Sequence, residues 1–406
     1  MSKPLQNGDI KLLDGEFYAD RPLEHFAWMR ENAPVYYDES EGIWGISLHE
    51  DIMKVSKSPD LFCSSKSSRP EPGSWIPSMI NLDDPDHKRR RNLVNRGFTP
   101  KRLLSSESKV RRICNQLIDA VCEKGECEFV REIAAPLPLI MIGDMLGMPE
   151  EDFETLLRWS EDMLQATSAT ATEEMRAKAM QAGAEYATYA VEAIQQRLET
   201  PRDDLLSILV NAKIDGDGLN QEELIHESLL ILVGGDETTR HVISEGTLAL
   251  IQNPSERQKL IDDPSKLPVA IEELLRWVTP IKNMNRTATT DTELRGQKIH
   301  EGDRMLLLYP SGNRDASVFE NPDQLDVERN PNPHVAFGGY GTHHCLGASL
   351  ARLELRIMFE ELNRRLPDIQ LATEEALPIR PSNFIVGIES MPVRFSPSAS
   401  EGWGNS

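Results

Sequence analysis

The sequence predicts a mainly α-helical fold in a single domain with a minor β portion. Apolar residues recur at helical spacing through most of the middle of the chain. Short segments with β-like alternation lie near its two ends. No internal repeat or Gly/Ser-rich linker divides the 406 residues, so we expect one domain over residues 1–406. A loose tail is expected from about Pro397.

In chain order, the first β-like pieces lie within residues 36–48. Residues 101–130 have helical apolar spacing, and further helical patterns follow them. Residues 298–308 have the alternation of a strand, and short strands are also expected near Phe384 and at residues 393–395.

The clearest helical pattern begins at Asn220. This residue is a good N-cap, and Glu223 three residues later completes a capping-box pattern. An apolar run at residues 229–233 leads into two glycines, after which helical spacing resumes. We therefore expect a long buried helix with the glycines inside it.

The overall charge is acidic, because 44 Lys and Arg face 66 Asp and Glu for a net charge of −22. Nucleic acids and anionic membranes attract cations, so general binding to either is not expected. No apolar stretch approaches the ~20 residues of a spanning helix, and residues 1–9 hold no apolar signal core. We therefore expect a cytoplasmic protein. The chain has five cysteines, and an odd number does not suggest a disulfide framework.

Residues 337–347 place four glycines around Cys345. Glycine lets a backbone approach a flat ligand closely, and a helix is expected to begin just after the cysteine. Free N–H groups at a helix N-terminus favour a thiolate, and a thiolate on haem iron promotes O–O cleavage. Taken alone, such a loop is more often a turn with a buried thiol. Zinc is a poor alternative, because His343 and His344 are adjacent and no further ligands follow at useful spacing.

The second segment with chemical potential is Gly-Gly-Asp-Glu-Thr-Thr at residues 234–239. Each glycine inside a helix costs on the order of 1 kcal/mol relative to alanine. A hydroxyl that bonds back to a carbonyl can open the helix, and the acid Glu237 beside the hydroxyl of Thr238 could relay protons. The alternative is a break between two helices, with Asp236 or Thr238 as an N-cap.

A third pattern is weak by itself. Glu273 and Arg276 share a helix face and can pair, but such pairs are common by chance.

These three segments occur in the order and approximate spacing of the cytochrome P-450 superfamily, which the chain resembles over nearly its whole length. The cysteine loop carries the most specific match, at Gly341, His343, Cys345, Gly347, Ala351 and Glu354. The resemblance implies the cytochrome P-450 fold, a haem b cofactor (iron protoporphyrin IX) and Cys345 as the iron ligand. It also implies that Thr238 and Glu237 deliver protons.

The resemblance implies further roles. Arg329 is expected to join Glu273 and Arg276, while His87, Arg91, Arg286 and His343 are expected to bind the haem propionates. Positive and hydrogen-bonding groups are what two buried carboxylates require. The other haem-pocket residues are expected to be Phe337, Gly338, Gly347 and Gly235.

Two positions depart from the family pattern. Gly338 stands where the family usually has Phe, with Phe337 one residue earlier, and Leu325 replaces another common Phe. Similar loops occur in actinobacterial members that oxidise sterols and lipids. At subfamily level the chain resembles the mycobacterial-type cholesterol/cholestenone side-chain terminal hydroxylases, in residues 14–18, 125–130, 142–147, 234–240 and 389–393.

The implied activity is a haem-thiolate monooxygenase that inserts one atom of O2 into an unactivated C–H bond of an apolar substrate, expected to be a steroid or sterol side chain. Electrons are expected from NAD(P)H through ferredoxin and ferredoxin reductase, with Arg112 and Arg352 as candidate docking contacts. One alternative is a monooxygenase of polyketide or terpenoid biosynthesis. Another is a non-catalytic haem-based sensor, which would need no relay by Glu237 and Thr238.

The expected substrate pocket draws on four segments and is apolar apart from Lys282. Its expected side chains are Trp75, Ile76, Met79, Ile80, Val233, Ile281, Met284, Phe384, Ile385 and Val386.

Overall fold

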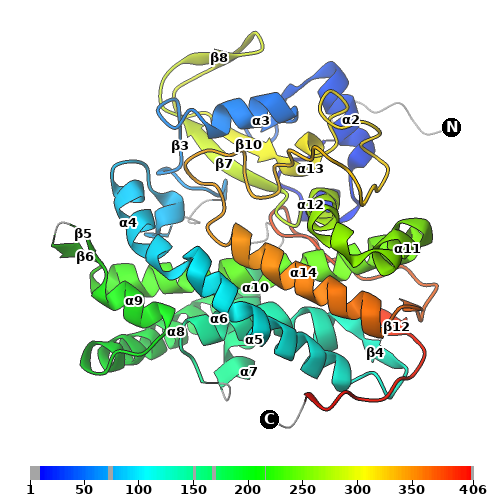
Figure 1. The fold of residues 1–406 in the computed structure, drawn as a ribbon. Coiled ribbons are helices and arrows are strands. Elements are labelled where there is room, and N and C mark those ends of the chain that lie inside the picture. The colour runs from blue at the N-terminus through cyan, green and yellow to red at the C-terminus, as the bar shows by residue number, and fades with distance from the viewer. Residues whose placement is uncertain (1–9, 72–75, 150–151, 167–170, 215, 404–406) are drawn as a thin grey trace.

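The computed structural model describes residues 10–71, 76–149, 152–166, 171–214 and 216–403. Figure 1 shows a smaller part that holds the largest sheet and the N-terminal helices, and a larger helical part beside it. The predicted mainly α fold with a minor β portion is confirmed. No helix in the described part of the chain is long and apolar enough to cross a membrane.

The helices account for most of the ordered structure. They are α1 (Gly15–Ala19), α2 (Leu23–Asn32), α3 (His49–Ser56), α4 (Asp86–Val94), α5 (Pro100–Asp119), α6 (Pro136–Met145), α7 (Phe153–Gln165), α8 (Glu173–Glu199), α9 (Leu205–Asn211), α10 (Gln221–Gln252), α11 (Pro254–Asp262), α12 (Leu267–Val278), α13 (Tyr309–Gly312) and α14 (Ala348–Arg365). Short 3-10 turns lie at η1 (Met79–Asn81), η2 (Asn95–Gly97) and η5 (Pro264–Lys266), and a π-helical turn lies at η3 (Val130–Ala134).

The long helix α10 organises the helical part and packs against α6, α8, α12 and α14. Its capping box is formed as predicted: Glu223 N–H donates to Asn220 Oδ1 (2.9 Å), and Asn220 N–H donates to Glu223 Oε2 (3.0 Å). The helix continues unbroken through Gly234 and Gly235. The prediction of one long buried helix is therefore confirmed, and the alternative of a break with Asp236 or Thr238 as N-cap is wrong.

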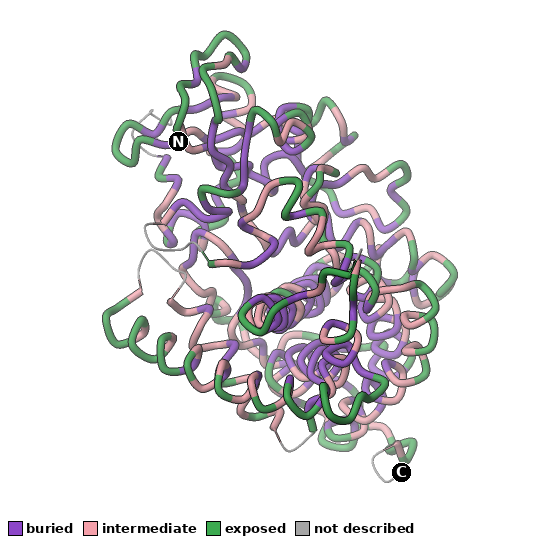
Figure 2. The backbone as a smooth tube through the Cα atoms, turned by 90° about the vertical axis from the view of Figure 1, so that its left-hand side faces the viewer, coloured by how far each residue is buried: buried purple, intermediate pink, exposed green. Residues whose placement is uncertain are grey.

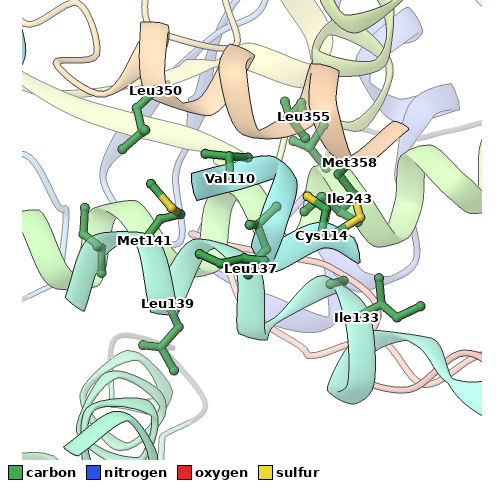
Figure 3. Packing of buried hydrophobic residues seen from close by; sticks show 14 of the residues in the cluster. Val110, Cys114, Ile133, Leu137, Leu139, Met141, Ile243, Leu350, Leu355 and Met358 are labelled. Atoms are coloured by element: carbon green, nitrogen blue, oxygen red, sulfur yellow. The ribbon is translucent and has the colours of Figure 1, made fainter. Parts of the chain in front are cut away.

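Apolar side chains from several helices form a continuous core around α10. Figure 3 shows side chains of α5, α6, α10 and α14 meeting in its interior, among them Val110, Leu137, Ile243 and Met358. Figure 2 shows the buried backbone gathered inside the molecule and the exposed segments around it. Burying one such side chain stabilises the fold by roughly 1.5–3 kcal/mol, so this packing fixes α10 against α14.

The sheets are small and lie outside the helical core. The strands are β1 (Val35–Asp38), β2 (Ile43–Ile46), β3 (Phe62–Cys63), β4 (Glu126–Glu128), β5 (Lys213–Ile214), β6 (Asp217–Gly218), β7 (Asn283–Ala288), β8 (Thr292–Leu294), β9 (Gln297–Ile299), β10 (Arg304–Leu308), β11 (Gln370–Leu371) and β12 (Pro392–Arg394). The largest sheet has the order β1-β2-β10-β7-β3, with β10 parallel to β2 and antiparallel to β7. In this register Met305 pairs with Arg286, which fixes the position of that arginine.

The prediction of one strand over residues 298–308 is wrong. The segment forms two strands, β9 and β10, with a turn between them. Gly302 adopts a φ of +89° in this turn, and His300 N–H donates to Asp303 Oδ2 (2.9 Å). The left-handed conformation, which glycine adopts readily, reverses the chain within a pattern that otherwise alternates like a strand.

The helix expected over residues 101–130 is only partly correct. Helix α5 ends at Asp119, and residues 126–128 form β4, which pairs with β12. The turn before β4 places Gly125 at a φ of +75°. The strand expected at residues 393–395 is confirmed as β12. Near Phe384 the described chain has only isolated antiparallel bridges, Ile385 with Ile281 and Ile388 with Ile379.

The segment expected to be a loose tail is held against α5 as far as the structure describes it. Glu401 N–H and Trp403 N–H donate to the two carboxylate oxygens of Asp119 (3.0 and 2.8 Å). The Glu401 carboxylate also accepts from Arg364 (2.6 Å). These polar contacts fix a segment whose composition alone suggested freedom.

Candidate active site

The cysteine loop, residues 337–347, is closed by its own backbone and packed tightly against α3. Cys345 N–H donates to the Phe337 carbonyl (2.9 Å), and Gly338 between them has a φ of +93°. A Cβ on Gly341 would lie 1.8 Å from the Ser56 carbonyl oxygen at the end of α3. Gly338 is therefore needed for its conformation and Gly341 for its close approach.

The loop presents the Cys345 side chain to an internal cavity, and its exposed surface faces that cavity. Burial raises the pKa of the thiol above its usual value, while the N–H groups of Gly347 and Ala348 and the charges of Arg91 and Arg352 lower it. The helix N-terminus thus acts on the sulfur in the direction the sequence predicted, but burial outweighs it. A cation bound to the sulfur would reverse the balance, because metal coordination deprotonates a thiol.

Helix α10 forms the wall of the cavity opposite the loop. Gly234, Gly235 and Thr238 line it, and Thr238 Oγ1 donates to the Gly234 carbonyl (3.1 Å). A Cβ on Gly235 would lie 2.9 Å from Ile142 Cδ1 of α6, so this glycine permits close helix packing. Gly234 has no such neighbour within 4 Å and leaves the wall open beside the hydroxyl.

Four basic side chains line the same cavity from separate segments. They are His87 and Arg91 of α4, Arg286 of β7 and His343 of the cysteine loop. The rings of His87 and His343 lie 4.1 Å apart, and Arg91 donates to the His344 carbonyl (2.5 Å). Burial, followed by the charge of Arg286, lowers the pKa of His343 to about 2, so this ring is neutral beside two guanidinium groups.

The cytochrome P-450 family model matches residues 75–367 of this chain. The chain belongs to the cytochrome P-450 family.

Similarity to individual cytochromes P-450 extends over nearly the whole chain. A steroid C26-monooxygenase of Mycolicibacterium smegmatis is 47% identical over 401 residues, which cover 98% of this chain and 99% of the relative. A methyl-branched lipid omega-hydroxylase of Mycobacterium bovis is 39% identical over 412 residues, which cover 96% and 95%. The structure of a cytochrome P-450 of Bacillus megaterium in complex with testosterone superposes with a TM-score of 0.84 at 33% identity, covering 92% of this chain and 99% of that one.

These similarities confirm the predicted family, fold and monooxygenase class. The family implies a haem cofactor, and the cavity residues fit one. His87 Nε2 is buried without a hydrogen-bond partner among the described residues, beside His343 and the guanidinium groups of Arg91 and Arg286. A buried group with two carboxylates would neutralise these cations and satisfy the orphaned nitrogen.

Glu237 does not face the cavity with Thr238 in this cytochrome P-450. Its carboxylate is fully buried and absent from the cavity lining, and it lies 3.1 Å from Arg240, 3.1 Å from His241 and 3.5 Å from Arg380. Burial alone would raise its pKa, but His241, Arg240 and Arg380 together hold the pKa well below its usual value. The acid is ionised and turned towards the C-terminal segment.

Two further carboxyl groups lie near the cavity, and no catalytic role was expected for either of them from the sequence. Glu354 of α14 lines the cavity, and burial, with a smaller effect of Asp236, raises its pKa to about 8. Asp236 is fully buried on α10, and burial followed by repulsion from Glu237 raises its pKa to about 7. Both positions belong to the motifs described above, but nothing in the sequence showed that their helices place Asp236 close enough to Glu354 to raise its pKa.

The predicted trio around Glu273 is confirmed. Arg276 donates to both Glu273 oxygens (2.7 Å each), and Arg329 Nε donates to Oε2 (3.0 Å). Arg276 also donates to the carbonyls of Asn313 (2.8 Å) and Pro322 (2.9 Å). Glu273 and Arg276 are buried, so this is a structural network and not a surface pair.

The expected pocket wall is partly correct. Met79, Ile80, Ile281 and Met284 line the cavity, whereas Val233 and residues 384–387 do not. Ile76 is exposed and also lies outside the lining. Trp75 lies outside the described residues. Apolar lining residues that the sequence analysis did not include are Phe98, Ile142, Val242, Leu275, Leu346 and Leu350.

Proposed function

We propose that this monooxygenase hydroxylates the terminal carbon of a steroid or sterol side chain. The observation that supports this most is the apolar cavity wall facing Cys345, which includes Ile80, Ile142, Ile231 and Val242. Such a wall holds a hydrocarbon by shape. The similarity to relatives named steroid C26-monooxygenase points to the same substrate class.

The cofactor in this proposal is haem b. Cys345 would hold the iron through its sulfur, and the basic cluster of His87, Arg91, Arg286 and His343 would hold the propionates. When bound, haem supplies the activation of O2 and the insertion of one oxygen atom into the C–H bond. The residues proposed to lie against the macrocycle are Phe337, Gly338, Gly347 and Gly235.

Thr238 is proposed to hold and pass protons at Oγ1. Its hydroxyl donates to the Gly234 carbonyl at rest and can turn towards the cavity that it lines. Glu237, whose pKa is held well below its usual value so that it is ionised at rest, would take up each proton from solvent and pass it to Thr238 Oγ1. Because Glu237 is paired with Arg240 and Arg380, its carboxylate must leave these partners to reach Thr238, and this release becomes a step of the proposal.

Thr238→Ala tests the relay. The variant should bind haem and substrate normally but lose coupling between NAD(P)H consumption and product by about tenfold or more, since a positioned proton donor typically contributes about 10²–10⁴-fold. Product and peroxide per NAD(P)H are measured, and Thr238→Ser, which keeps a hydroxyl, is the matched control. Unchanged coupling in Thr238→Ala would assign the protons to another group.

Electrons are proposed to come from NAD(P)H through a ferredoxin and its reductase, which suits a cytoplasmic enzyme. The partner would dock on the Cys345 side of the molecule. Arg352 already donates to Glu272 (2.6 and 2.7 Å), so Arg112 is the better candidate contact of the two for an acidic partner.

The substrate is tested with the haem-loaded protein. Cholest-4-en-3-one or cholesterol should shift the haem to high spin at micromolar concentration, and a reconstituted reaction should give a terminally hydroxylated side chain. A shift with a macrolide or terpenoid and none with either sterol would overturn the steroid assignment. Binding without product from any of them would favour the sensor alternative.

A further inference from the structure

Besides long helices, strand β7 and the cysteine loop, the wall of the cavity includes the short 3-10 turn η1. Met79 and Ile80 of η1 line the cavity, as do Leu230 and Ile231 of α10. A single 3-10 turn has little rigidity of its own. The shape of this wall therefore depends on what holds the turn in place.

The turn is held by a buried carboxylate on α10. Met79 N–H donates to Glu227 Oε1 (2.8 Å), and Glu227 is fully buried, three residues before Leu230. Arg90 of α4 donates to the same oxygen (3.1 Å) and also to the Pro77 carbonyl (2.6 Å). Glu227 and Arg90 thus bind the segment through two backbone groups, the Met79 N–H and the Pro77 carbonyl.

This arrangement is more than a surface ion pair. The Arg90 side chain is 13% exposed and that of Glu227 is 0% exposed, so water competes little for either contact. Burial raises the pKa of Glu227 to about 7, and Arg90 together with the Met79 N–H opposes that rise. Without these two partners the pKa of Glu227 would be higher still.

We propose that Glu227 and Arg90 form a latch that positions Met79 and Ile80 and so determines which substrates the cavity accepts. Glu227 is not among the residues that line the cavity. It is a positioning residue that acts through the backbone of Met79. The substrate class in this inference rests on the proposed function, but the latch itself does not.

The test compares Glu227→Ala with Glu223→Gln in the haem-loaded protein. Glu223 lies one turn earlier on α10 and also contacts Arg90 (3.0 Å), but within the described part of the chain it makes no hydrogen bond to η1. Glutamine preserves its capping role. The control therefore removes a charge from the same arginine without touching the latch contact to Met79.

In Glu227→Ala, the Kd of cholest-4-en-3-one should rise at least fivefold, while the Kd of imidazole, too small to need the wall, should stay within twofold. Hydrogen exchange of peptides covering residues 77–82 should accelerate. Glu227→Gln retains an acceptor for Met79 N–H, so the rise in the Kd of cholest-4-en-3-one and the acceleration of exchange should both be smaller. This variant replaces Glu227→Ala if the alanine variant does not fold. Glu223→Gln should change neither the Kd of cholest-4-en-3-one nor the exchange of residues 77–82.

Econazole, a bulky apolar azole, makes the test independent of the steroid assignment. If the wild-type protein binds no steroid, the ratio of econazole to imidazole affinity reports on the same wall. Unchanged exchange at residues 77–82, or an equal loss of affinity for large and small ligands, would overturn the latch and leave Glu227 a purely structural residue.

Discussion

Cys345→Ala is expected to abolish the absorption band that a haem-thiolate protein shows when it is reduced and exposed to carbon monoxide, and to reduce hydroxylation to background. The sulfur is the electron-donating ligand in this assignment, and alanine offers no replacement. The protein should still fold, because the hydrogen bond that closes the loop comes from the Cys345 backbone to the Phe337 carbonyl.

Cys114→Ala is the matched control. This cysteine is fully buried in the core between α5 and α14 and lies outside the cavity lining. Its removal should lower stability slightly by leaving a small void, while the carbon monoxide band remains. A band that survives in Cys345→Ala would show that another residue binds the iron.

The parts of the fold predicted correctly are those with local signals. Helix α10 combines a capping box at Asn220 with a sustained helical period, and both are properties of neighbouring residues. The turn within residues 298–308 was missed because alternation continues on both sides of Gly302. Strand β4 was missed because its partner, β12, lies far away in the chain.

The same distinction holds for the active site. The cysteine loop is a compact motif and could be found directly, whereas His87, Arg286 and His343 come together only through the fold. Family resemblance was needed to group them. The orientation of Glu237 was not predicted. Arg240 and His241 lie three and four residues further along the same helix, but Arg380 approaches from the C-terminal segment and only the fold brings it there.

The latch was not anticipated for a related reason. Glu227 is an ordinary acidic residue in a helical pattern, and no spacing in the sequence links it to Arg90 or to the backbone of Met79. Only tertiary packing brings α4, η1 and α10 together. Partners of this kind leave no mark in a single sequence.

Glu273→Gln is expected to have the largest effect on stability. Removing one partner from a buried ion pair costs about 3–5 kcal/mol, because the remaining charge is left without compensation. Here two arginines would lose their shared carboxylate, and Arg276 is only 1% exposed. A denaturant titration followed by far-UV circular dichroism measures the change.

Glu272→Gln provides a control at the neighbouring position on α12. Glu272 pairs with Arg352, and both side chains are partly exposed, at 27% and 36%. It also lies 3.1 Å from the His334 ring. Because partly exposed pairs contribute about 1 kcal/mol or less, the loss of stability should be smaller than in Glu273→Gln. Equal losses of stability in the two variants would contradict the structural role assigned to Glu273.

The effect of Glu273→Gln should also reach the cysteine loop. Arg276, held by Glu273, donates to the Asn313 carbonyl (2.8 Å), and Asn313 Oδ1 accepts from Val335 N–H (2.7 Å). The Val335 carbonyl in turn accepts from Gly338 N–H (2.9 Å). A loosened network should therefore lower haem retention during purification, measured as haem absorbance per protein, while Glu272→Gln retains haem like the wild type. Full haem occupancy in a strongly destabilised Glu273→Gln would show that the network supports the fold without supporting the loop.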